Sequence, residues 1–548
     1  MTEATAAVAT TNEAIERQDQ IVLGVPSRRV VIILLSVLVL VGFAFRVTNL
    51  DAIGFAEDEV NKVDAIRAYE HGDITANGEH PMLMKAMMFA SLKTARFITA
   101  GGRTISDEAA FRFPNALFGA LTAIPLFLLT AAFFDRWTGL LAAAFWSVGV
   151  NAITYNRIGK EDTLLVFFML FAFYFYLRAK QSDSRNVAFT KRKYLLSGIS
   201  FGLMLASKYF PHYWGLNALY HQKFAVRKRQ PGEPGGRVPR VFYIALVVAF
   251  LIANPPVLLP QVWNYLNSYM GEKLLVHTGY LFADQLYKNN VSRSPFWGTP
   301  IYFYLVFMAI KIPLAVLASF VVGLVVAIKR RGNAAYAFTL FMFLLWIIPY
   351  SFFGAKWLRY TLSLMPFVYM LAAIGAVELG RVLSNRIGGT ERARLVAGAA
   401  VVLIFIAEPA WSAYRSYPHY ALYTNALAAD KVGYFFPHDE FYDDGLREAI
   451  QFVCTHAPPG AVIAHETPAA THYYLERFGR LDLNSKAMSL PDFQIGNISG
   501  PAYIIVQRGR TYFENRDKVA IVRSTFTKLY EVKANGIVAA EVFANQNK

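Results

Sequence analysis

Apolar runs long enough to cross a lipid bilayer recur along this chain, and they constrain its fold more than any other feature. A transmembrane α-helix needs about 20 predominantly apolar residues. Hydrophobic residues make up 55% of the 548 residues and charged ones only 17%, below the quarter typical of soluble domains. We therefore predict a polytopic α-helical membrane protein. Its expected spans, about eleven by this criterion, are residues 27–48, 108–133, 138–154, 163–179, 194–208, 210–225, 240–256, 301–328, 334–353, 359–379 and 394–410.

The basic residues indicate how these spans are oriented. The net charge of +16 does not point to nucleic-acid binding, because Lys and Arg gather in short clusters between apolar runs, as expected for cytoplasmic loops. The apolar stretch 82–99 carries three basic residues. All the basic clusters fall on the cytoplasmic side only if this stretch lies on the membrane surface and does not cross the membrane. The N-terminus is then cytoplasmic. The segments expected on the extracytoplasmic side are 49–107, 155–162, 257–300 and everything after about 410.

The composition divides the chain into three parts. Residues 1–26 are polar and are expected to form a disordered cytoplasmic tail. Residues 27–410 hold the spans. After Trp411, short apolar strands such as 503–507 alternate with amphipathic helical patterns such as 446–454, so residues 411–548 are expected to form a small extracytoplasmic α/β domain. The lone Cys454 excludes an intrachain disulfide.

An acidic pair, Asp58 and Glu59, follows the first span. A carboxylate here is a candidate general base, because it is ionised at neutral pH and can still accept a proton as the transition state develops. Taken alone, the pair has a stronger structural explanation. Acids stabilise the first turn of a helix, and Asp58 stands four residues before Lys62, the spacing of a helical ion pair.

The segment His80-Pro81-Met82-Leu83-Met84-Lys85 indicates a helix start at the membrane face, since Pro81 suits the first helical position. A helix N-terminus can hold an anion. Lys85, one turn later, adds a point charge suited to phosphate. The alternative is an interfacial helix with a lysine that extends to the headgroups.

Further charged residues stand at the ends of later spans on the same side. Arg157 and Asp162 flank a tight turn, and Lys208 lies at the end of a span, where a lysine is costly unless it is paired or reaches the interface. Lys356 and Arg359 lie before a late span, and a guanidinium such as that of Arg359 can bind a phosphate with two parallel hydrogen bonds. A lipid phosphate entering from the bilayer would need such a ring of cations.

Together these segments resemble the C-type (GT-C) membrane glycosyltransferases, in particular bacterial relatives of the protein O-mannosyltransferases and the lipid A aminoarabinose transferases. Order and spacing agree across roughly residues 27–380. Met82 replaces the second proline of the family's His-Pro-Pro motif, and the lack of a Trp-Trp-Asp segment argues against the oligosaccharyltransferase branch. The matching segments are Asp58-Glu59, His80 to Lys85, Arg157 to Asp162 and Lys356 to Tyr360.

The resemblance implies an enzyme of the bacterial plasma (inner) membrane that moves a sugar from a polyprenyl-phosphate donor to a protein, lipid or glycan acceptor, with inversion. Asp58 would be the base, with Glu59 beside it, and Asp162 would orient Arg157 or the sugar. It also implies a set of donor phosphate ligands, drawn from His80, Lys85, Arg157, Lys208, Lys356 and Arg359.

A cofactor is not certain from the sequence. Some members of the resembled family use a divalent metal and others do not, and the weak candidates for its ligands are His438, Asp439 and Glu440. The alternative function is a membrane transporter or lipid flippase with an outer sensing domain, which the number of spans and the basic residues also allow. Against it, most expected spans lack central charges and the sequence shows no internal repeat.

Overall fold

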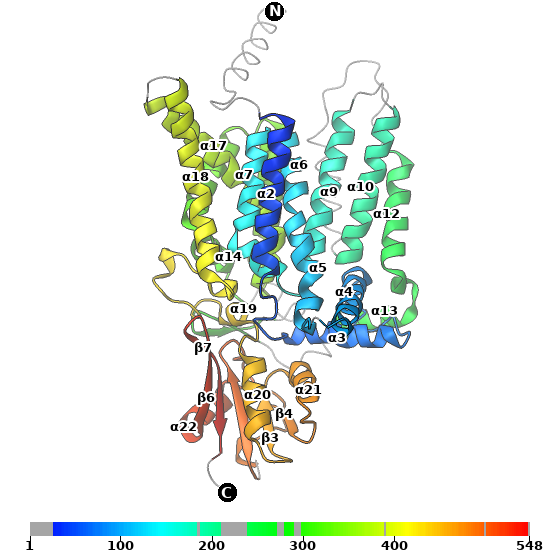
Figure 1. Ribbon diagram of the computed structural model, residues 1–548, viewed down its shortest axis with the longest axis vertical. Helices are drawn as coiled ribbons and strands as arrows, with labels where there is room; N and C mark the ends of the chain where they lie inside the picture. Colours follow the sequence, from blue (N-terminus) through cyan, green and yellow to red (C-terminus); the bar gives the residue numbers. More distant parts are fainter. Residues whose placement is uncertain are drawn as a thin grey trace, which may run out of the picture.

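The computed structural model describes residues 26–102, 104–182, 187–209, 238–270, 279–289, 298–387, 391–497 and 500–545. A bundle of helices lies along the long axis of the molecule, and a β-sheet stands at one end of it (Figure 1). The bundle helices are α2 (Arg28–Val47), α5 (Asp107–Leu121), α6 (Ala123–Phe133), α7 (Arg136–Val148), α8 (Val150–Asn156), α9 (Asp162–Gln181), α10 (Val187–Ser207), α12 (Arg240–Ala253), α14 (Phe303–Lys311), α15 (Leu314–Lys329), α16 (Ala334–Phe352), α17 (Met365–Ile387) and α18 (Glu391–Ser416).

The predicted helical character is confirmed, while the number of spans stays a prediction. Within the described ranges, five helices are long and apolar enough to cross a membrane, or six if α7 and α8, bent by 57°, form one span. The expected span 301–328 is instead broken at Ile312, which is extended before Pro313, because a proline disfavours helical backbone in the residue before it. The expected span 210–225 lies outside the described residues.

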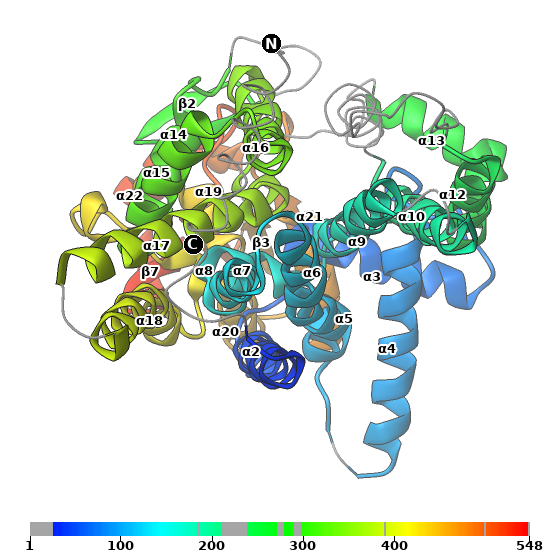
Figure 2. The ribbon, with the colours of Figure 1, turned by 90° about the horizontal axis from the view of Figure 1, so that it is seen from above.

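The bundle has two sides around a central group. Figure 2 shows α9, α10 and α12 on one side, α14 to α18 on the other, and α5 to α8 between them. Small residues allow the closest approach. A Cβ atom at Gly323 of α15 would lie 1.8 Å from a backbone oxygen of α17, and one at Gly375 of α17 would lie 1.8 Å from a backbone oxygen of α15. Backbones can meet this closely only at glycine, as is common between membrane helices.

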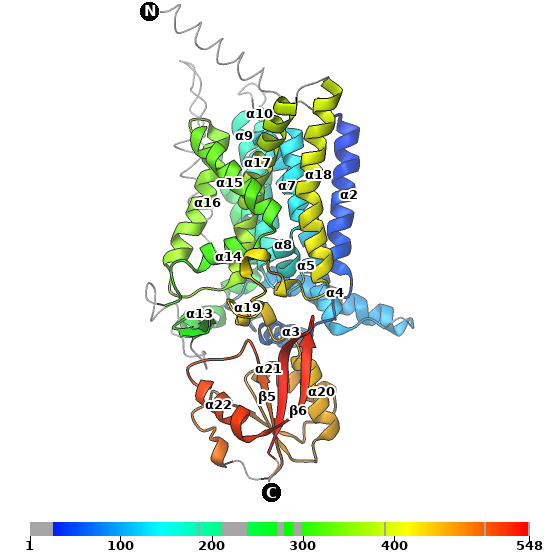
Figure 3. The same cartoon turned by 90° about the vertical axis from the view of Figure 1, so that its left-hand side faces the viewer.

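Three helices lie across the end of the bundle that carries the sheet (Figures 1 and 3). They are α3 (Glu57–Glu70), α4 (Met82–Ala100) and α13 (Pro260–Met270). The stretch expected to lie on the membrane surface is α4, which buries Met84, Met88 and Leu92 on one face and leaves Phe97 82% exposed. Short elements at the same end are η1 (Pro255–Leu258), β1 (Tyr280–Phe282), β2 (Gln285–Tyr287), η2 (Leu358–Ser363), η3 (Tyr420–Leu422), η4 (Ala426–Ala428) and α19 (Pro437–Phe441).

The sheet is mixed and has the strand order β4-β3-β5-β7-β6. Strand β3 pairs in parallel with β4 and β5, whereas β7 pairs antiparallel with β5 and β6. In Figure 3, α20 and α22 lie on opposite faces of this sheet. The elements are α20 (Leu446–His456), β3 (Val462–His465), α21 (Pro468–Arg477), β4 (Asn484–Ala487), η5 (Ile495–Asn497), β5 (Ala502–Gln507), α22 (Arg516–Thr525), β6 (Thr527–Ala534) and β7 (Ile537–Ala544).

One hydrophobic core joins the sheet to the helices across the end of the bundle. Ile450 of α20 and Ile505 of β5 belong to the same buried cluster as Phe55, Val60 of α3 and Met84 of α4. Burying apolar area is the main favourable term in folding. The sheet therefore shares its core with residues 49–60, which carry Asp58 and Glu59 and are called the acidic loop below.

Candidate active site

Four residues that are far apart in the sequence meet at the start of α3. The Asp58 Oδ2 atom lies 2.7 Å from the Lys160 ammonium and 2.9 Å from the Arg359 guanidinium, and it accepts a 3.2 Å hydrogen bond from the Tyr442 hydroxyl. Lys160 belongs to the turn before α9, Arg359 to η2, and Tyr442 follows α19. The Asp58 side chain is 39% exposed, so a reactant can reach it.

The charges around Asp58 set its ionisation. Desolvation alone would raise its pKa, but Lys160, Arg359 and Lys62 outweigh that effect and hold the pKa of Asp58 well below its usual value. An opposite charge within about 4–6 Å favours the charged form of a carboxyl group in this way. The carboxylate is therefore ionised at neutral pH, as a proton acceptor must be.

A second charged cluster stands beside the first. Glu161, with 1% of its side chain exposed, lies 3.1 Å from the Lys62 ammonium and 3.5 Å from His80 Nδ1. Lys62 thus pairs with Glu161. Its contact with Asp58 is a hydrogen bond to the backbone carbonyl and not to the carboxylate, so the Asp58–Lys62 ion pair suggested by the sequence does not form. Burial and the nearby lysines hold the pKa of His80 well below its usual value, which keeps the ring neutral.

Asp162 and Lys208, both singled out from the sequence, are brought together. The Asp162 Oδ1 atom lies 2.5 Å from the Lys208 ammonium, which also stands 4.7 Å above the centre of the Tyr360 ring. Asp162 is the first residue of α9, where a negative charge is favourable. This pair explains how a lysine is tolerated at the end of α10.

Lys85 is bound to backbone carbonyl oxygens and makes no ion pair among the described residues. Its ammonium donates to the carbonyl oxygens of Ala76, Asn77 and His80 at 3.1, 2.6 and 3.0 Å. Only 1% of Lys85 is exposed, and burial lowers its pKa to about 8. The geometry shows Lys85 holding the loop before α4.

Arg157 and Lys356 are also bound to the backbone. The Arg157 guanidinium donates to carbonyls at the C-terminal end of α2, an arrangement that satisfies acceptors the helix itself leaves open. Lys356 donates to the carbonyls of Thr299, at 2.7 Å, and Phe353. Arg157 binds the carbonyls of Phe45 and Arg46 in the last turn of α2, at 3.2 and 2.9 Å, and those of Thr48 and Asn49 just after it, at 2.7 and 2.8 Å.

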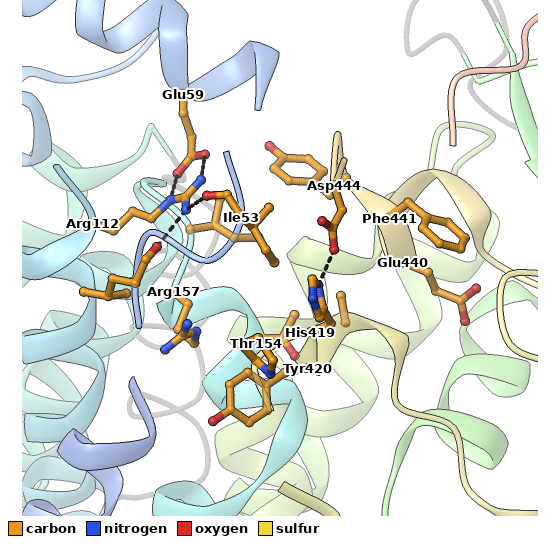
Figure 4. Close-up of a pocket in the computed structure, with 15 residues that line it drawn as sticks. Ile53, Glu59, Arg112, Thr154, Arg157, His419, Tyr420, Glu440, Phe441 and Asp444 are labelled. Carbon is orange, nitrogen blue, oxygen red and sulfur yellow. Dashed lines mark hydrogen bonds and ion pairs between the residues drawn. The ribbon is translucent and has the colours of Figure 1, made fainter. Parts of the chain in front are cut away.

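Glu59 is fully buried against Arg112. Figure 4 shows the two side chains facing each other at a cavity of about 50 Å³. The contacts between them measure 2.8 and 2.6 Å, and Glu59 also accepts from the N–H groups of Gly159 and Ala56. Arg112 further donates to three carbonyls of the loop before α3. Glu59 therefore holds the loop through Arg112 and two backbone N–H groups.

The three candidate metal ligands do not converge. His438 Nδ1 lies 3.1 Å from the carbonyl oxygen of Gly509, Asp439 accepts from Tyr280, and Glu440 pairs with Lys311. A metal site needs several ligand atoms directed at one point. Within the described ranges, no group of three His, Cys, Asp or Glu side chains is placed to hold a metal ion. These residues do not fit the divalent metal that the sequence left open.

Sequence reasoning did not assign three residues that the structure places at the site. Lys160 stands in the charged turn 155–162, so its neighbours were a usable signal. Arg112 lies inside an apolar helix, where a buried charge indicates a partner. Tyr442 carried no signal, because only the packing of α19 against the loops brings it to Asp58.

Comparison with known proteins shows which fold this chain has. The model of the dolichyl-phosphate-mannose-protein mannosyltransferase family matches residues 94–259. No curated protein sequence matches the chain. The structure is similar to that of ArnT from Cupriavidus metallidurans bound to undecaprenyl phosphate, with a TM-score of 0.50, 13% identity, and coverage of 94% of this chain and 97% of that one.

It is also similar to the oligosaccharyltransferase of Archaeoglobus fulgidus tethered with an acceptor peptide, with a TM-score of 0.51, 12% identity, and coverage of 95% of this chain and 74% of that one. The chain therefore has the fold of the GT-C membrane glycosyltransferases, and the resemblance predicted from its motifs is confirmed.

Proposed function

We propose that this protein is an integral-membrane glycosyltransferase that moves a sugar from a polyprenyl-phosphate donor to a protein, lipid or glycan acceptor. The observation that carries the proposal is the partly exposed Asp58 carboxylate held by Lys160 and Arg359 in a fold similar to that of a protein bound to undecaprenyl phosphate. Acceptor activation needs a carboxylate, and departure of a lipid phosphate needs cations beside it.

Asp58 acts as the general base in this proposal. Its carboxylate takes the proton of the acceptor hydroxyl while the hydroxyl oxygen forms a bond to the anomeric carbon. The bond from that carbon to the phosphate oxygen breaks, and polyprenyl phosphate leaves with the electron pair. Attack from the face opposite the phosphate inverts the anomeric centre. A phosphate that draws Lys160 and Arg359 toward itself would also raise the basicity of Asp58.

The leaving phosphate is proposed to bind Arg359, Lys160 and Lys208, whose side chains are 19%, 5% and 13% exposed. His80 remains a neutral hydrogen-bonding candidate at the edge of this group. Asp162 is proposed to orient the sugar, because its buried Oδ2 atom has no hydrogen-bond partner among the described residues. We assign the other candidates to holding loops in place. Three of them, Lys85, Arg157 and Lys356, donate to backbone carbonyls, and Glu59 is paired with Arg112.

The proposed enzyme spans the plasma membrane of a bacterium about eleven times, with its N-terminus in the cytoplasm. Residues 411–548 would form an extracytoplasmic α/β domain, and the site would face the same side. The family model and the fold both favour the transferase over the transporter or flippase that the sequence left open.

The test is release of polyprenyl phosphate by purified protein in nanodiscs, with a panel of polyprenyl-phosphate sugars and a mixture of acceptors. We expect release by the wild type and loss of at least 10³-fold with Asp58→Asn, within the range expected for removing a catalytic base. Asp64→Asn is the matched control, because Asp64 lies on the same helix with 55% of its side chain exposed. Wild-type turnover by Asp58→Asn would refute the assignment of the base.

A further inference from the structure

The carboxyl ends of the parallel strands face the acidic loop. This is the edge of the sheet at which α/β proteins commonly bind ligands. In open α/β sheets, ligands bind outside the carboxyl ends of parallel strands where successive connections leave toward opposite faces. Strand β3 lies between its parallel neighbours β4 and β5. Helix α21, which joins β3 to β4, packs in the core with α20. Residues after β4, such as Met488 and Phe493, pack with α22 on the other face.

At this edge of the sheet, the helix that follows β3 binds a carboxylate of the same polypeptide. The two carboxylate oxygens of Glu57 accept hydrogen bonds from the N–H groups of Ala469 and Ala470, both at 2.9 Å. These N–H groups belong to the first turn of α21, which follows β3. A carboxylate at a helix N-terminus is favoured by the free N–H groups and by the helix dipole.

The end of β5 holds the same point of the chain through Asp443. The backbone N–H of Glu57 donates to Asp443 Oδ2 at 3.0 Å. Asp443 is fixed in turn by Gln507, the last residue of β5, whose amide donates to Oδ1 at 2.9 Å, and by the Arg510 guanidinium. The side chain of Glu57 is therefore bound to the helix that follows β3, and its backbone is bound, through Asp443, to the end of β5.

Three further contacts hold the rest of the loop to the C-terminal part of the chain. Arg447 donates to the carbonyls of Asp51 and Ala52 at 2.8 and 3.1 Å. The Tyr474 hydroxyl accepts from the Phe55 N–H at 2.6 Å. Tyr442 reaches Asp58 itself. The loop is thus held at positions 51, 52, 55, 57 and 58.

We propose that Glu57 and Tyr442 are positioning residues through which the sheet holds the Asp58 carboxylate in place for sugar transfer. The proposal rests on the proposed function. Glu57 precedes Asp58 on the first turn of α3, so the direction of the Asp58 side chain depends on how that turn is bound. The sheet is then a structural part of the catalytic site. Misplacing a reacting group by about 1 Å can cost on the order of 100-fold in rate.

Two variants test the positioning role. In Glu57→Gln one carboxylate oxygen becomes an NH₂ group that faces a backbone N–H, and Tyr442→Phe removes the hydroxyl that reaches Asp58. We expect each to lower kcat about tenfold. The KM for the donor should change less than twofold, because neither side chain belongs to the proposed phosphate group. Glu531→Gln, on the far strand β6 in an exposed ion pair, is the matched control and should match the wild type.

A second readout does not depend on activity. Phe55 is fully buried, so chymotrypsin can cut after it only when the loop opens, and the cutting rate then follows the open population. We expect about tenfold faster cleavage after Phe55 in Glu57→Gln, since one N–H group of α21 loses its acceptor. Glu531→Gln should be cut at the wild-type rate.

The outcomes separate the two proposals. Wild-type kcat in both variants, with unchanged cleavage in Glu57→Gln, would overturn the positioning role and leave the transferase intact. Faster cleavage in Glu57→Gln with unchanged kcat in both variants would also overturn it, because the loop would then be held without consequence for Asp58. If the wild type transfers no sugar while Glu57→Gln opens the loop, the sheet still holds the loop and the proposed function fails.

Discussion

The buried pair of Glu59 and Arg112 gives the sharpest test of how the acidic loop is built. The substitution is Glu59→Gln, which keeps the size of the side chain and removes its charge. In the structure the Glu59 carboxylate accepts four hydrogen bonds, two from Arg112 and one each from the backbone N–H groups of Gly159 and Ala56. None of the Glu59 side chain is exposed to solvent.

The expected magnitude follows from this burial. Removing one partner of a buried ion pair leaves the other charge uncompensated and costs about 3–5 kcal/mol. Arg112 is 5% exposed, so water compensates little of the loss. Because each 1.4 kcal/mol is a factor of ten, local opening of the loop should rise roughly 140- to 3,700-fold.

Amide hydrogen exchange in peptides that cover residues 49–60 measures this opening directly. We expect accelerated exchange there in Glu59→Gln and no change in peptides from α17. The control is Glu70→Gln at the other end of α3, whose pairs with Lys93 and Arg96 are partly exposed and worth at most about 1 kcal/mol. Unchanged exchange with abolished transfer would refute the structural role and make Glu59 a catalytic residue.

Three further predictions concern the cations and the packing. Burial lowers the pKa of Lys160 to about 7, so the positive charge of Lys160 beside Asp58 is lost as the pH rises through 7. We expect kcat to fall over the same pH range. Lys160→Arg should extend activity to higher pH, because a guanidinium stays protonated. Lys85→Met should lower the melting temperature, since three carbonyls lose their donor, and leave the donor KM unchanged; a large rise in KM would return Lys85 to the phosphate site. Gly375→Val should lower thermal stability because a side chain there meets the α15 backbone, whereas Gly332→Val, with open space around it, should not; equal melting temperatures would contradict the close packing.

The candidate residues divide according to what sequence can reveal. The sequence predicts Asp58 as a base, Asp162 as an orienting carboxylate, and Lys208 and Arg359 as phosphate ligands, and the structure brings these four into neighbouring pairs. It also predicts Lys85, Arg157 and Lys356 as phosphate ligands, but they bind carbonyl oxygens. A cation that binds backbone carbonyls cannot be told from a cation that binds a substrate anion by sequence alone. Every residue has a carbonyl, so the sequence does not show which carbonyls need a donor.

The sequence alone determined that this chain is helical and apolar along most of its length, since twenty-residue apolar runs leave the backbone no other way to satisfy its hydrogen bonds in lipid. It also indicated which segments hold the candidate site residues. Only the tertiary structure decided which charges meet. Asp58 and Tyr442 are separated by 384 positions, and the Glu57 carboxylate binds a helix more than 400 residues away. Such contacts depend on how the sheet packs against the helix bundle in one shared core. A local sequence pattern cannot show which residues this packing brings together.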